Sequence, residues 1–152
     1  MKDKILEAFS ELGFKLEEEE GMGYSFNYEG LTFLYMYNEN DDEFLNIALP
    51  GIMDVEEDKM VQICTLLEKI NSTLKYVKAY TLGGSIWLFY ERELIGLRDN
   101  KADGQQPDGE DLTTVISRMI LHLEAGIGFA RKAMAEIEET MGNGSSDDDN
   151  NE

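Results

Sequence analysis

The sequence predicts an α+β fold in which an antiparallel sheet of about five strands carries three helices, in the order α-β-β-β-α-β-β-α. Tyr24, Phe26 and Tyr28 alternate with polar residues, and a tight turn at Glu29-Gly30 leads into a richly apolar strand over 31–37. Residues 76–82 and 85–91 form two further strand segments. Gly83-Gly84 joins the last two segments and tolerates the positive φ angles of a two-residue hairpin turn. Strands joined in this way run antiparallel, unlike the strands of a doubly wound nucleotide-binding fold.

The first half of the chain supplies one helix and three or four strands. Residues 2–12 place apolar side chains at helical spacing, and Gly13 follows as a C-terminal stop. Residues 14–17 are a candidate for a short strand ahead of the alternating segments, and residues 44–49 form a strand after them. We expect Pro50-Gly51 to end that strand, because proline has no backbone N–H to donate to a neighbour.

Two more helices complete the set of elements. Asp54 and Glu57 have the spacing of a capping box, which predicts a helix over about residues 55–73. A longer helix is expected from about Asp111 to Met141, after a polar loop.

The predicted elements fall within residues 1–141, which have the length of a single domain. Residues 142–152 are glycine-rich and acidic and cannot bury apolar surface, so we expect a disordered acidic tail.

The charge of the chain restricts its partners. Thirty-two acidic and 13 basic side chains give a net charge of −19, which opposes binding to nucleic acid phosphates or to an anionic membrane. Cys64 is the only cysteine, so an intrachain disulfide is excluded and a reducing, cytoplasmic setting is expected. We find no targeting segment, and the longest apolar run, residues 86–90, is far shorter than the roughly 20 residues that cross a bilayer.

One loop resembles a calcium site in part. Asp99, Asp103 and Glu110 have the spacing of the first, fifth and twelfth ligands of a calcium loop, with Gly104 at the sixth position. Lys101 places a positive charge where the third ligand should be. We therefore predict an ordinary loop over 99–110 and no metal, with calcium binding left as the alternative.

No pattern of catalytic residues stands out. His122 has no carboxylate one helical turn away, and Cys64 lies beside apolar neighbours where a buried, inert thiol is expected. A Cys64–His122 pair would need the two residues to meet in space. We predict no catalytic residues, no cofactor and no enzyme activity.

The last helix carries a long apolar stripe. In its second half the stripe includes Ile127, Ala130, Met134 and Ile137. Two interpretations remain open at this point: the helix covers its own sheet, or these four residues form a dimer contact.

The central strands are apolar on both faces, so the second face needs cover from a helix, a second subunit or a partner. A partner-binding sheet face is the hypothesis we adopt. Its predicted residues are Phe33, Tyr35, Met36, Tyr37, Trp87 and Phe89.

With these elements in place, the chain resembles the fold shared by type III secretion chaperones and YbjN-like sensory-transduction regulators. The resemblance covers residues 2–141, and its most recognisable part is the hairpin segment 83–91, Gly-Gly-Ser-Ile-Trp-Leu-Phe-Tyr-Glu. It implies a non-catalytic homodimer, with the second helix and its neighbouring strand in the interface and apolar grooves for an extended segment of another protein. The polar loop at 99–109 and the long last helix depart from this pattern.

The predicted function is therefore a cytoplasmic, non-catalytic protein-binding module, chaperone-like or regulatory and homodimeric. Its partner would be a protein or peptide with an apolar or basic segment, and neither nucleic acid nor membrane is expected to bind. The alternatives are an acidic nucleic-acid mimic that binds a basic protein, and a small-ligand sensor or enzyme.

Overall fold

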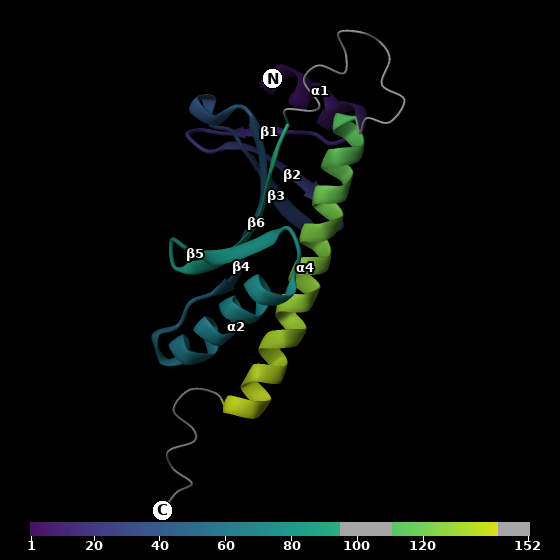
Figure 1. The fold of residues 1–152 in the computed structure, drawn as a ribbon. Coiled ribbons are helices and arrows are strands. Elements are labelled where there is room, and N and C mark those ends of the chain that lie inside the picture. The colour runs from purple at the N-terminus through teal and green to yellow at the C-terminus, as the bar shows by residue number, and fades with distance from the viewer. Residues whose placement is uncertain (95–110, 143–152) are drawn as a thin grey trace, which may run out of the picture.

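The computed structural model describes residues 1–94 and 111–142 and confirms the α+β fold (Figure 1). The predicted loop at 99–109, the calcium alternative at 99–110 and the tail beyond residue 142 lie outside the described residues. The elements, in chain order, are α1 (Lys2–Glu11), β1 (Glu17–Glu19), β2 (Gly23–Tyr28), β3 (Leu31–Met36), the 3-10 turn η1 (Glu39–Asp41), β4 (Phe44–Asp54), the 3-10 turn η2 (Glu57–Lys59), α2 (Met60–Thr73), β5 (Val77–Leu82), β6 (Ser85–Glu93) and α4 (Leu112–Met141).

The strands described here form one six-stranded antiparallel sheet in the order β1-β2-β3-β4-β6-β5. The sheet has one strand more than the five expected. The order shows that β6 lies between β4 and β5, so the late hairpin joins the sheet through its second strand.

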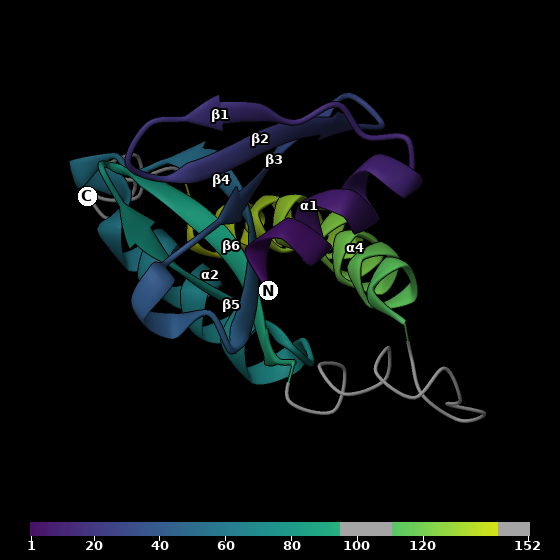
Figure 2. The same cartoon turned by 90° about the horizontal axis from the view of Figure 1, so that it is seen from above.

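All three helices contribute to a single hydrophobic core. Buried residues of α1, α2 and α4 form one cluster with alternate residues of β2, β3, β4, β5 and β6. The long helix α4 runs past both α1 and α2 and so connects the two ends of the molecule (Figures 1 and 2). Its apolar stripe therefore covers its own sheet.

The two predicted hairpin turns are confirmed. Glu29 and Gly30 both have positive φ angles, 51° and 76°, between β2 and β3. Gly83 and Gly84 have φ angles of 62° and 82° between β5 and β6. This backbone twist matches the twist of paired strands, and glycine adopts it without steric cost.

Two boundaries near the middle of the chain were predicted wrongly. Strand β4 does not end at Pro50-Gly51 but continues to Asp54, because the register shifts between Leu49 and Met53. Proline is accommodated at such a bulge since no ladder hydrogen bond is required there. Asp54 is consequently a strand residue and does not cap the second helix, which begins at Met60 without a side-chain cap.

The start of the sheet also differs from the prediction. The first strand is Glu17–Glu19 and not residues 14–17. Phe14 precedes it, with its ring 5.0 Å from that of Phe26 and 6.2 Å from that of Phe9. The apolar residues of this segment thus anchor it to the core, and the exposed glutamates form the edge strand.

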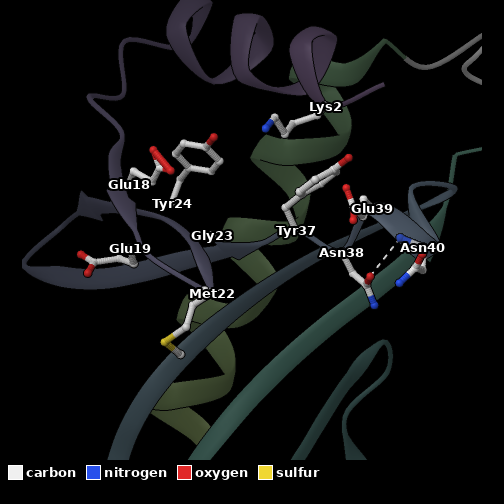
Figure 3. A pocket seen from close by; sticks show the side chains of 11 residues that line it. Lys2, Glu18, Glu19, Met22, Gly23, Tyr24, Tyr37, Asn38, Glu39 and Asn40 are labelled. Atoms are coloured by element: carbon white, nitrogen blue, oxygen red, sulfur yellow. Dashed lines mark hydrogen bonds between the residues drawn. The ribbon is translucent and has the colours of Figure 1, made fainter.

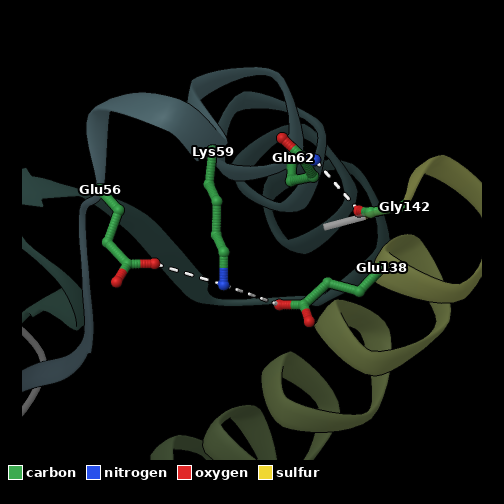
Figure 4. A network of polar contacts seen from close by, with 5 residues as sticks. All are labelled: Glu56, Lys59, Gln62, Glu138 and Gly142. Carbon is green, nitrogen blue, oxygen red and sulfur yellow. Dashed lines mark hydrogen bonds and ion pairs between the residues drawn. The ribbon is translucent and has the colours of Figure 1, made fainter. Parts of the chain in front are cut away.

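The ends of α4 are held by polar contacts. At its start, Asp111 accepts a hydrogen bond from the backbone N–H of Thr114 at 2.8 Å, as an N-cap residue does. Near its end, the buried Gln62 donates to the carbonyl of Gly142 at 3.2 Å, and Lys59 lies between Glu56 and Glu138 (Figure 4). The hydrogen bond with Glu56 and the charge of Glu138 raise the pKa of Lys59.

Candidate functional site

The main candidate site is the sheet face opposite the three helices, here called the open face. Leu34, Ala48 and Phe89 lie directly opposite one another on β3, β4 and β6, and all three are buried. None of them belongs to the core cluster that the helices cover. Their side chains point to the other face because the residues before and after them point into the core.

Neighbouring rings bury the centre of the open face. The Tyr80 ring on β5 stacks on the Phe89 ring with centroids 4.3 Å apart, and the Trp87 ring lies 5.9 Å from that of Phe89. Tyr80 is itself 42% exposed and Trp87 is half-buried. The outer surfaces of these two rings therefore remain available to a partner.

The structure divides the predicted partner-binding residues between the two faces. Met36, Trp87 and Phe89 belong to the open face. Phe33 and Tyr35 instead point into the core and are buried, with 0% and 1% of their surface exposed. Burial raises the pKa of the Tyr35 hydroxyl.

Tyr37 lies just beyond the end of β3 and is half-buried. Its ring contacts the Tyr35 ring edge to face at 6.4 Å. It also lines the two hollows at this end of the sheet.

The residues predicted for a dimer contact on the last helix are not a surface of this chain. Ile127, Ala130, Met134 and Ile137 are each no more than 7% exposed and belong to the core. The stripe that predicted them is explained by packing within the chain. A homodimer would have to use another surface.

A hollow of about 480 Å³ lies at one end of the open face. Met36, Asn46 and Glu91 lie opposite one another across three strands and contribute to it from the sheet. Asn46 Nδ2 lies 3.5 Å from Glu91 Oε1, whereas Asn46 Oδ1 is buried and has no hydrogen-bond partner. Lys78 forms an ion pair with the same Glu91 oxygen at 3.2 Å.

A second hollow of about 350 Å³ adjoins the first and shares Met22 and Tyr37 with it. Figure 3 shows Lys2 reaching from α1 toward Tyr24 and Tyr37. Its ammonium lies 4.9 Å from the centre of the Tyr37 ring and 5.9 Å from that of Tyr24. A hydrogen bond with Tyr24 raises the pKa of Lys2.

The edges of the sheet are less available than its face. On β5, the side chain of Asn71 accepts a hydrogen bond from Ala79 N–H at 2.8 Å and donates one to Ala79 C=O at 3.0 Å. These backbone groups point away from β6, so Asn71 occupies the place of a further strand. At the opposite edge, β1 consists of three exposed glutamates, a composition that discourages strand addition.

The structure places Cys64 and His122, the two residues considered as a nucleophile–base pair, in different surroundings. Cys64 is exposed, so the expectation of a buried thiol was wrong. The imidazole of His122 packs against the rings of Tyr76 and Tyr90, with centroids 5.3 and 5.8 Å away. Within residues 1–94 and 111–142, no group of three metal-binding side chains is close enough to hold an ion. In the same residues, no helix has the length and apolar character needed to cross a membrane.

Sequence reasoning identified Met36, Trp87 and Phe89 of this site. It missed Tyr80, which stacks on Phe89, and it missed the polar members of the site. Asn46 was the available signal, since it is the single polar side chain between Phe44 and Leu49. Its pairing with Glu91, 45 residues later, depends on the strand order and cannot be derived from local pattern.

Comparison with known proteins supports the fold only. No protein-family model matches the chain, and a search of curated proteins gives no match. A crystal structure of an uncharacterized protein from Methanothermobacter thermautotrophicus is similar, with a TM-score of 0.54 and 15% identity. The similarity covers 91% of this chain and 97% of that one, so nearly all of both chains share the architecture.

Proposed function

We propose that the protein is a non-catalytic protein-binding module, chaperone-like or regulatory, that holds a partner segment on its open face. The segment would be apolar and would also carry basic residues. The observation that supports this most directly is the stack of Tyr80, Phe89 and Trp87 on a sheet face that no described helix covers. Large aromatic side chains exposed side by side are typical of interaction surfaces.

The surroundings of the stack favour a flexible, adaptable contact. Met36 and Phe44 continue the apolar surface toward the hollow, and Met22 is 41% exposed at its rim. Methionine repacks easily against different side chains, which suits a surface that holds segments of varied sequence. Asn71 closes one sheet edge, and the acidic strand β1 at the other edge discourages strand addition, so we expect the segment to lie across the face and not to extend the sheet.

Charge indicates the sign of the partner. The chain has a net charge of −19, and the end of the open face carries Glu93 together with Glu91, which is paired with Lys78. A second copy of the same face would bring like charges together, whereas a basic segment would be attracted. We place this function in the cytoplasm, where an exposed lone thiol such as Cys64 stays reduced.

Selection of random displayed peptides on the immobilised protein tests the proposal. We expect the selected peptides to combine apolar with basic residues, and their affinity to fall by at least about tenfold on Trp87→Ala. Leu121→Ala is the matched control, since Leu121 is 51% exposed but lies on α4. Peptides without basic residues, or equal losses in both variants, would contradict the proposal. Light scattering on the same samples measures whether the chain is the homodimer that the resemblance implies.

A further inference from the structure

The exposed apolar side chains of the open face form two groups. Tyr80, Leu82 and Trp87 form the first group on β5 and β6, with Tyr80 42% and Leu82 40% exposed and Trp87 half-buried. Met36 and Phe44 form the second group on β3 and β4, and Phe44 is 38% exposed. Leu82 and Phe44 belong to this face because each lies two residues along its strand from a side chain that points there. A partner that covers the face must therefore contact apolar side chains at two separate places.

The strand register gives the distance between the two groups. Trp87 and Glu91 lie four residues apart on β6, and Glu91 is paired through Asn46 on β4 with Met36 on β3. Four residues of a strand span about 13 Å and two strand spacings about 10 Å, so Trp87 and Met36 lie about 16 Å apart on the sheet. The midpoint of this line is at Ala48, which is buried and too small to stand between the two groups.

The backbone of the sheet is already paired along this line. Strand β3 pairs with β4 over residues 34–36, and β4 pairs with β6 over residues 44–49. An extended segment on the face would have no strand to pair with, and its N–H and C=O groups would lie over apolar side chains without partners. A helix makes its backbone hydrogen bonds internally and presents side chains to the surface that it contacts. The open face therefore suits a helical segment better than an extended one.

Charge near the second group favours a basic partner over a second copy of this chain. Glu19 lies in the same cross-strand row as Met36, and Glu93 lies directly opposite Phe44. Both glutamates are exposed, and the chain as a whole has a net charge of −19. A second copy would bring the same carboxylates together, whereas basic residues in the half of a helix that lies over Met36 would be attracted.

From these observations we infer that the open face binds an amphipathic helix of the partner, which places one apolar pair on Trp87 and Tyr80 and a second on Met36 and Phe44. The inference rests on the proposed function and specifies the form of the partner. At a rise of 1.5 Å per residue, 16 Å corresponds to about 11 residues, or about three turns, so both apolar pairs fall on the same side of the helix. An extended segment would cover the same distance in about five residues.

The test uses the peptide acetyl-ALQAQLQQAQRQLRQALR-amide, whose leucine pairs are about 11 positions apart on one side of a helix and whose arginines accompany the second pair. Its counterpart, acetyl-ALQAQLQQAPRQLRQALR-amide, has a central proline that breaks the helix and keeps every leucine and arginine. Trp87 is the only tryptophan of the full chain, so its fluorescence reports directly on the open face.

We expect a saturable change in this fluorescence with the first peptide, a gain of helix content by circular dichroism on mixing, and binding at least about tenfold weaker for the proline peptide. No saturable change with the first peptide, or equal binding of the two peptides, would overturn the inference.

Protein variants test whether the helix contacts both apolar groups. Met36→Ala should weaken the first peptide about fivefold or more, whereas Met60→Ala, at a methionine that is 44% exposed on α2, should change nothing. Equal effects of the two variants would overturn the inference. A dimer that dissociates on Trp87→Ala, measured by light scattering, would show that a second copy covers the face and would also overturn it.

The peptides selected by display separate this inference from the proposed function. If their binding depends on Trp87 but tolerates a central proline, the proposed function stands and the helical form is refuted. If their binding does not depend on Trp87, the proposed function itself fails.

Discussion

Replacement of Asn71 by alanine tests whether a single side chain closes the edge of the sheet. Asn71 makes two hydrogen bonds, of 2.8 and 3.0 Å, to the backbone of Ala79 on edge strand β5. Each bond contributes about 1 kcal/mol net, so their loss costs about 2 kcal/mol. Alanine is a better helix former than asparagine by roughly 0.5 kcal/mol, which offsets part of this loss. The free energy of unfolding should therefore fall by about 1.5 kcal/mol.

The variant should also change how the chain associates. Without Asn71, the N–H and C=O of Ala79 face outward and can pair with another strand, as unprotected edges do. We expect faster hydrogen exchange at the Ala79 amide and a dimer or larger species by light scattering at high concentration.

Ser72→Ala provides the control, because the neighbouring Ser72 is exposed and makes only a weak contact within α2, at 3.4 Å. Denaturant unfolding of both variants gives the comparison. If Asn71→Ala is as stable as Ser72→Ala and exchanges the Ala79 amide at the same rate, the edge-closing role is refuted.

Three smaller changes test other parts of the structure. Gly23→Ala should destabilise the protein by at least about 2 kcal/mol, because Gly23 has a φ of 147° and an added Cβ would lie 1.9 Å from the Tyr35 carbonyl oxygen. Gly128→Ala on α4 meets open space and should stabilise by roughly 0.5–1 kcal/mol; denaturant unfolding measures both, and a reversed order would contradict the packing. Hydrogen bonds from Thr114 lower the pKa of Asp111, so its cap stabilises above the unfolded pKa of about 3.9 and is lost as the pH falls through the lower folded value. Asp111→Asn keeps an acceptor that does not titrate, so the stability of wild type relative to this variant should decrease in that acid range; a constant difference would rule the effect out.

The elements that sequence predicted correctly are those with local signals. Glu29-Gly30 and Gly83-Gly84 select hairpin turns through backbone conformation alone, and the stripe of α4 follows helical periodicity over its whole length. The strand end at Pro50 was predicted wrongly because the strand forms a bulge there. A bulge depends on the partner strand and does not require the backbone N–H that proline lacks.

The candidate site was harder to predict than the fold. Strands with apolar residues on both faces do not reveal which face the helices cover, so Tyr35 and Met36 could not be separated by pattern. The helices within residues 1–94 and 111–142 lie on one side of the sheet, and this tertiary arrangement decides that Tyr35 is core and Met36 is on the other face. The contact between Asn46 and Glu91 arises from strand order, which local sequence does not encode.

The measurement that tests the central claim most directly is the affinity of one selected apolar and basic peptide for the wild-type chain, Trp87→Ala and Leu121→Ala, by calorimetry on proteins shown to be folded. We predict a loss of at least about tenfold for Trp87→Ala and no change for Leu121→Ala. Unchanged affinity in Trp87→Ala would show that the open face is not the binding surface.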